Sequence, residues 1–97
     1  MKAVFIFYYI EYEEDVMRIL AKTKIEAYSK WKKVLGRGKN STPRLDTSVW
    51  PGFNGALFIA LEDEQKLKNL LEEIKAFAQL HHHTGISAFV LPLDRVV

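Results

Sequence analysis

Four apolar runs alternate with two amphipathic segments along this chain, and their order limits the folds that it can adopt. The apolar runs are rich in β-branched and aromatic residues, as strands are, and cover 2–10, 25–34, 53–61 and 86–93. The amphipathic segments repeat apolar residues at helical spacing behind an acidic first turn, and cover 11–23 and 64–82. The sequence therefore predicts the order strand, helix, strand, strand, helix, strand, which is an α+β arrangement.

This element order is that of a ferredoxin-like βαββαβ sandwich, in which an antiparallel four-stranded sheet carries two helices on one face. The 97 residues, 48% of them hydrophobic, are enough for one core, so we expect a single domain over 1–97. Gly55, inside the third strand, indicates a bulge or the close approach of another group to the backbone. Pro92 confines the end of the last strand to an edge of the sheet.

Aromatic residues are spread over the expected strands in a way that two helices cannot cover. Because side chains alternate between the faces of a sheet, some of them must lie on the face away from the helices. These aromatic residues are Phe5, Phe7, Tyr9, Trp31, Phe58 and Phe89. A large exposed apolar surface on a small domain usually marks an interface. We therefore expect a homo-oligomer.

The segment at 35–52, between the second and third strands, is an unusually long loop. Connections in compact domains commonly have about four to six residues, and loops beyond roughly twelve to fifteen are usually functional or disordered. Between Lys22 and Arg44 the chain carries eight basic residues and one acidic residue, Glu26. Such a concentration of positive charge attracts anions. The loop is therefore the predicted functional segment, and an anion is its predicted ligand.

Other features exclude several classes of protein. The chain has no cysteine, which rules out disulfides and a Cys nucleophile and fits a cytoplasmic location. The apolar run at 2–10 is too short for a membrane span, so no direct membrane insertion is expected. The acidic junction at 10–15 would repel the phosphate that an acylphosphatase-like enzyme binds there, and no catalytic triad or carboxylate pair stands out. We therefore expect no enzymatic activity.

An RNA-binding module with the same strand order is one alternative. Residues 51–58 (PGFNGALF) echo the RNP1 pattern of a basic residue, glycine and stacking aromatics. However, Pro51 stands where the cation is needed, and Gly55 stands where a stacking aromatic is needed. The sequence therefore predicts no nucleic-acid partner.

Three consecutive histidines, His81, His82 and His83, are candidate metal ligands at the end of the second helix. Successive residues of a helix point about 100° apart, so one chain cannot direct all three at one ion. In a symmetric oligomer, the same side chain from several subunits can still meet at an axis. His81 also continues the apolar stripe of the helix, so the alternative is a packed or interface histidine followed by two residues at a frayed end.

With this element order, three segments resemble the nitrogen-regulatory PII-like signalling proteins. VLGRGK at 34–39 is similar to the family's GFGRQK motif at the base of a long loop, FIALEDE at 58–64 to its third strand, and FVLPLDRVV at 89–97 to its last strand. The chain differs from the family pattern at Gly38 and over 81–87. Gly38 replaces a glutamine, and HHHTGIS at 81–87 replaces a Gly-rich phosphate-binding segment.

The resemblance implies a cytoplasmic, non-catalytic, homotrimeric signal-transduction protein. An anionic effector, an adenine nucleotide among the candidates, would bind in clefts between subunits, and the long loop would regulate a transporter or an enzyme. The implied effector-binding residues are Gly36, Arg37, Gly38, Lys39, Thr84 and Gly85. The expected partner-binding residues of the loop are Thr42, Arg44 and Trp50; the alternative for Trp50 is that it folds back on the sheet. In the alternative, a CutA-like protein, a divalent metal would bind His81, His82 and His83.

Overall fold

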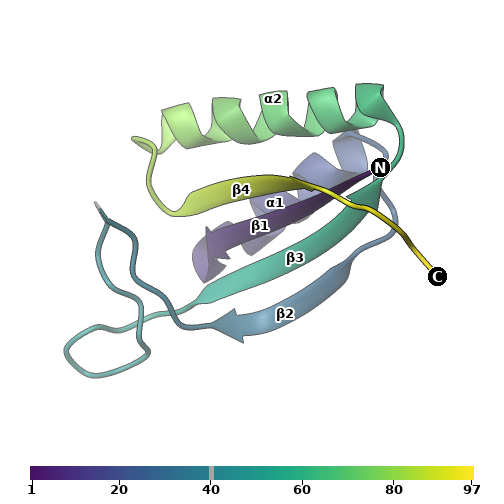
Figure 1. Cartoon of the computed structure of the whole chain (residues 1–97). Helices are drawn as coiled ribbons and strands as arrows, with labels where there is room; N and C mark the ends of the chain where they lie inside the picture. The colour runs from purple at the N-terminus through teal and green to yellow at the C-terminus, as the bar shows by residue number, and fades with distance from the viewer. Residues whose placement is uncertain (40) are drawn as a thin grey trace.

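The computed structural model describes residues 1–39 and 41–97, and it contains the predicted elements in the predicted order (Figure 1). Asn40, which belongs to the expected loop, lies outside the described residues. The strands are β1 (Lys2–Tyr9), β2 (Ser29–Val34), β3 (Asn54–Leu61) and β4 (Ile86–Pro92). The helices are the 3-10 turn η1 (Ile10–Tyr12), α1 (Glu13–Lys22) and α2 (Glu64–Leu80).

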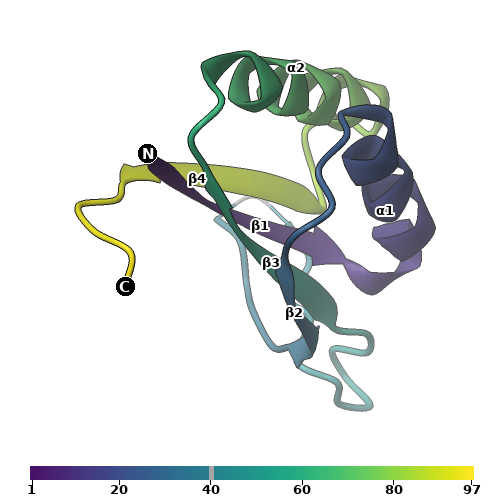
Figure 2. The ribbon, with the colours of Figure 1, turned by 90° about the vertical axis from the view of Figure 1, so that its right-hand side faces the viewer.

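The strands form one four-stranded antiparallel sheet in the order β2-β3-β1-β4. Both helices lie on the same side of this sheet (Figure 2). The predicted ferredoxin-like α+β sandwich is therefore confirmed. Pro92 ends β4, which is an edge strand, as the sequence predicts. Over the described residues, no helix combines the length and the apolar character that crossing a membrane requires.

The hydrophobic core lies between the two helices and the sheet face that they cover. On β1, the side chains of Val4, Ile6 and Tyr8 are at most 1% exposed. Leu20 from α1 and Leu70 from α2 belong to the same buried cluster. Burial of every second residue along β1 is what an antiparallel strand with one covered face requires. The core is thus built by one face of the sheet and by the apolar stripes of both helices.

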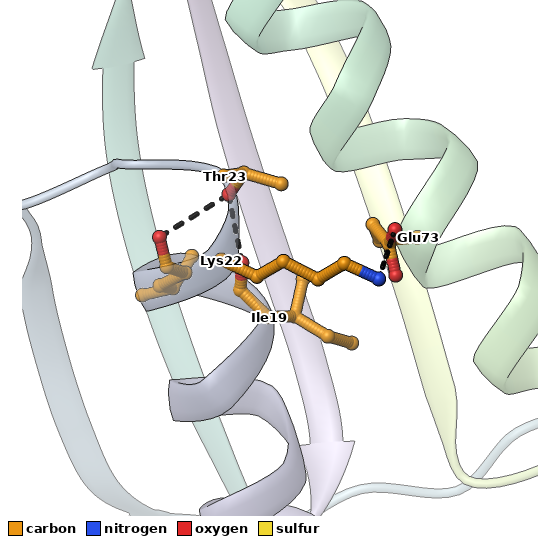
Figure 3. A network of polar contacts seen from close by, with 5 residues as sticks. Ile19, Lys22, Thr23 and Glu73 are labelled. Carbon is orange, nitrogen blue, oxygen red and sulfur yellow. Dashed lines mark hydrogen bonds and ion pairs between the residues drawn. The ribbon is translucent and has the colours of Figure 1, made fainter.

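β2 begins at Ser29, later than the sequence predicts, because the chain first closes the end of α1. The Thr23 hydroxyl donates to the carbonyl oxygen of Ile19 at 2.8 Å (Figure 3). The backbone N–H of Ile25 donates to the carbonyl oxygen of Leu20 at 2.9 Å. Ile25 is thereby buried in the core although it does not belong to a strand. Capping of the helix therefore replaces the first part of the predicted strand.

α2 begins where predicted, since the carboxylate of Asp63 accepts hydrogen bonds from two backbone N–H groups of its first turn. The helix ends at Leu80 rather than at residue 82. His82 and His83 both have a φ of 57°, which an α-helix cannot contain.

An ion pair between Lys22 Nζ and Glu73 Oε1, at 2.9 Å, joins α1 to α2 (Figure 3).

The sheet face away from the helices carries an apolar surface, as the sequence predicts. Because residues paired across antiparallel strands share a face, the pairing of Phe5 with Phe58 and Phe89 places all three there. We call this surface the open-face patch; it consists of Phe5, Phe7, Trp31, Phe58, Phe89 and Leu91. Trp31, Phe89 and Leu91 are 49%, 54% and 48% exposed. The two helices leave this face uncovered.

Candidate anion-binding site

The loop between β2 and β3 folds back on itself. The backbone groups of Gly36 and Arg44 pair in both directions, with N–H to oxygen distances of 3.0 and 2.8 Å. Beyond this pair, the N–H of Leu45 donates to the carbonyl oxygen of Trp50 at 3.2 Å, and the N–H of Asp46 to that of Gly52 at 2.9 Å. The loop therefore contains a narrow base, the pair of Gly36 with Arg44, and a compact turn over 45–52.

Side chains attach this loop to the end of the sheet. The guanidinium carbon of Arg44 lies 3.6 Å from the ring centroid of Tyr9, the last residue of β1. Lys33 of β2 forms an ion pair with Asp46. Gly52, at a φ of 86°, packs so closely on Tyr9 that a Cβ atom there would lie 3.1 Å from the ring. The segment leaving β2 and the segment entering β3 are thus both held near the end of β1.

A cavity of about 390 Å³ lies at the base of the loop. Its walls come from the ends of β1, β2 and β3, from the loop, and from the start of β4. The lining residues are Phe7, Tyr8, Val34, Leu35, Gly36, Arg37, Gly38, Ser41, Thr42, Arg44, Asn54, Gly85, Ile86, Ser87 and Phe89. Two of these are arginines and, among the described residues, none is acidic. This excess of positive charge suits the cavity to an anion, and arginine offers a planar group of N–H donors for one.

The cavity also offers neutral donors and an apolar wall. Ser41, Thr42, Ser87 and Asn54, whose side chains carry hydroxyl or amide groups, are lining residues beside the arginines. Aromatic and aliphatic side chains line it as well. Apolar walls with a few polar groups are typical of small-molecule sites, and their volumes are roughly 300–1,000 Å³. The cavity falls at the lower end of this range.

A separate polar cluster joins three elements next to the core. The hydroxyl of Tyr8 donates to one oxygen of the Glu13 carboxylate, and Lys30 Nζ lies 2.6 Å from the other. Burial raises the pKa of Tyr8, and its hydrogen bond to Glu13 raises the pKa further. Burial also acts to raise the pKa of Glu13, but the hydrogen bonds from Lys30 and Tyr8 outweigh it, and the pKa is lowered. The cluster ties β1, α1 and β2 together.

Acidification should reveal the contribution of Glu13 to stability. Because its pKa is lower in the folded chain than its ordinary value of 4.5, this stabilisation is present above pH 4.5 and is lost as the pH falls through the folded pKa. Glu13→Gln should therefore lower the melting temperature at neutral pH and reduce its decline in acid, as measured by calorimetry. Equal declines for wild type and variant below pH 4.5 would contradict this assignment.

The chain superposes on solved structures of PII-like proteins. CPII from Thiomonas intermedia K12, a nitrogen regulatory PII-like protein, superposes in its apo form with a TM-score of 0.69 and 17% identity, over 93% of this chain and 85% of that chain. The structure of CPII bound to ADP, AMP and bicarbonate also gives a TM-score of 0.69 and 17% identity, over 97% and 88% of the two chains.

A putative PII-like signalling protein from Thermus thermophilus gives a TM-score of 0.63 and 19% identity, over 93% of this chain and 83% of that chain. This chain has the PII-like fold. No protein-family model and no curated protein sequence matches the chain. The resemblance that the three sequence segments indicated is therefore confirmed by the three-dimensional arrangement, at low sequence identity.

In this PII-like fold, the cavity brings together most of the residues that the resemblance implied for effector binding. Gly36, Arg37, Gly38 and Gly85 line it. Lys39 and Thr84 are not among the lining residues. Thr84 instead donates its hydroxyl to the carbonyl oxygen of His81 at 3.0 Å. Arg37 and the glycines of the loop thus meet Gly85 at one place, although Gly85 is distant from them in sequence.

The residues expected to contact a protein partner divide between two places. Thr42 and Arg44 line the cavity. Trp50 does not line it and is 41% exposed in the turn beyond. Sequence reasoning missed Asn54 and Ser87, whose signal was their strand register: Asn54 is paired with Tyr9 and Ser87 with Phe7, at the same end of β1.

The three histidines do not form a metal site within one chain of the PII-like fold. His81 stacks on Phe77 with ring centroids 4.0 Å apart, and its Nδ1 lies 2.9 Å from the Phe77 carbonyl oxygen. His82 and His83 are exposed in the turn that follows. Over residues 1–39 and 41–97, no group of three or more His, Cys, Asp or Glu side chains is placed to hold a metal ion. Within one chain, His81 is therefore a packed histidine rather than a metal ligand grouped with His82 and His83.

Proposed function

We propose that this chain is a divergent PII-like regulatory protein, without catalytic activity, that binds a small anionic effector in the cavity at the base of its loop. One observation carries this proposal: Arg37 and Arg44 both line the cavity, and no acidic residue does among those described. CPII, which shares the fold, has been solved with ADP, AMP and bicarbonate. An adenine nucleotide or a carboxylate-sized anion is therefore the class of effector that we propose.

The residues of the cavity fit the parts of such an effector. Arg37 and Arg44 would bind phosphate or carboxylate oxygens through their planar groups of N–H donors. Gly36 and Gly38 lack a Cβ atom, so the backbone of the loop can approach the anion closely. Phe89 would pack against the apolar part of a nucleotide.

Self-association of the domain formed by residues 1–97 belongs to the same proposal. The open-face patch is an apolar surface on a small domain, and such surfaces usually mark interfaces. Phe7 and Phe89 belong both to this patch and to the lining of the cavity. A neighbouring subunit seated on the patch would therefore complete the cavity from outside. We propose that the assembly is a homotrimer with one effector site at each subunit boundary.

The loop would transmit effector binding to a protein partner, a transporter or an enzyme. Arg37, Gly38 and Arg44 belong to the loop and line the cavity, so a bound anion would contact the loop directly. Val49 and Trp50, in the turn beyond, are 71% and 41% exposed. An exposed tryptophan is a frequent anchor at protein interfaces. Ordering of the loop by the effector would then change how this turn meets the partner.

Calorimetric titration with ADP, AMP and bicarbonate tests the proposal. We expect Arg37→Ala to weaken binding of the anion about tenfold, because a charge-assisted hydrogen bond contributes roughly 1.5–3 kcal/mol and the change leaves the rest of the cavity intact. Arg18→Ala is the matched control. It removes the same charge from an exposed ion pair on α1, which contributes little to stability. Absence of binding by the wild type, or equal losses in both variants, would refute the proposal.

A further inference from the structure

We propose that Tyr9 is a positioning residue for this anion site: its ring holds Arg44 at the wall of the cavity, so that effector affinity depends on a side chain outside the cavity lining. The inference rests on the proposed function, because it assigns Arg44 as the second cation of the same site. Tyr9 itself does not line the cavity.

Arg44 is restrained both at its backbone and at its side chain. Its N–H and carbonyl groups both pair with Gly36, across the base of the loop. Its guanidinium carbon lies 3.6 Å from the centroid of the Tyr9 ring, within the range of a cation–π contact. Among the described residues, no carboxylate lies within ion-pair distance of Arg44. The charge of Arg44 is therefore held in place without being neutralised.

Tyr9 is in turn held by its neighbours. Tyr12 meets its ring edge to face, with centroids 5.8 Å apart. Gly52 packs against the ring, where an added Cβ atom would lie 3.1 Å from Cε1. The ring is thus contacted by η1 and by the segment that returns to β3. A ring confined in this way provides a fixed surface for the guanidinium.

The backbone of Tyr9 also contacts the part of the cavity wall that β4 and the residue before it provide. Its N–H donates to the carbonyl oxygen of Gly85 at 2.7 Å, and Gly85 is a lining residue. Tyr9 therefore contacts the loop wall through its side chain and the β4 wall through its main chain. Arginine loses rotamer freedom when it binds a ligand, and a guanidinium already in place loses less. This is why replacing the ring should weaken binding of the anion.

Tyr9→Leu and Tyr9→Phe separate the positioning role from a general effect on folding. In calorimetric titrations with ADP and with bicarbonate, we expect Tyr9→Phe to retain affinity within about twofold, because the aromatic face remains. Tyr9→Leu should weaken binding about fivefold, because the cation–π contact is lost. Arg44→Ala should weaken it at least as much. The double variant should bind no more weakly than Arg44→Ala, since Tyr9 acts through Arg44.

Thermal melting of each variant shows whether it is folded at the titration temperature. If Tyr9→Leu does not fold, Arg44→Lys takes its place: it keeps the charge but loses the planar stacking group, and we expect about fivefold weaker binding. The inference alone is overturned if Arg37→Ala weakens binding while folded Tyr9→Leu binds as the wild type does, or, where Tyr9→Leu does not fold, while Arg44→Lys does so. It is also overturned if the losses of Tyr9→Leu and Arg44→Ala add in full. Absence of binding by the wild type overturns the proposed function as well.

Discussion

Leu91→Lys is expected to convert the proposed assembly into monomers while each subunit stays folded. Leu91 belongs to the open-face patch and is 48% exposed in the single chain, so the change should cost the subunit roughly 1 kcal/mol or less. In an assembly formed through this patch, each lysine would be buried without a partner. That costs several kcal/mol per ion, and every 1.4 kcal/mol corresponds to tenfold. Association should therefore weaken by at least about 100-fold.

Sedimentation velocity or light scattering after gel filtration measures this change in mass. Leu80→Lys is the matched control, because Leu80 is an exposed leucine at the end of α2, away from the open-face patch. A lysine near a helix C-terminus is also compatible with the helix dipole. The control should keep the wild-type mass. A monomeric wild type, or a Leu91→Lys variant with wild-type mass, would show that this face is not the interface.

Gly55→Ala is expected to destabilise the fold by about 2 kcal/mol, within the range of overpacked cores. Gly55 lies directly across from Tyr8 in the pairing of β1 with β3. An added Cβ atom would lie 2.7 Å from both Cζ and the hydroxyl oxygen of Tyr8. The Tyr8 ring cannot move aside easily, because it is 1% exposed and its hydroxyl is bonded to Glu13. The free-energy cost of this steric overlap should therefore exceed the stabilisation gained when alanine replaces glycine in a strand.

Urea unfolding measures the loss, and two comparisons locate its cause. Gly36→Ala should be nearly neutral in stability, because its Cβ atom would lie 3.4 Å from the Asn54 side chain, an ordinary contact. In a Tyr8→Leu background, the shorter side chain should remove most of the cost of Gly55→Ala, which a double-mutant cycle would show as coupling. Additive losses would mean that the Tyr8 ring is not the obstacle.

Several features of the fold could be predicted because they depend on neighbours in sequence. Apolar runs and helical spacing located the strands and helices, and a glycine inside an apolar run indicated the close approach that Tyr8 makes at Gly55. The strands carry more aromatic residues than two helices can cover, and this predicted an uncovered apolar face of the sheet. The predicted start of β2 was wrong. Ile25 is a residue type common in strands, but it is buried through the capping turn of α1.

The candidate site could be predicted only in part. The GRGK segment marked Arg37, but nothing near Arg44 indicated that its guanidinium stacks on Tyr9 or that it shares a cavity with Arg37. Asn54 and Ser87 joined the lining through strand register. Lys39 has the expected charge but does not line the cavity. The prediction failed there because the charge of a residue does not determine which surface its side chain contacts.

The element order, the uncovered apolar face and the basic loop follow from the amino-acid sequence, because each reflects periodicity or composition within short stretches of chain. The cavity follows from folding, because its walls are joined by contacts such as those from Tyr9 to Gly85 and to Arg44, which link residues far apart in the chain. Such contacts depend on how strands pair and how the loop closes, and no local pattern of residues specifies them.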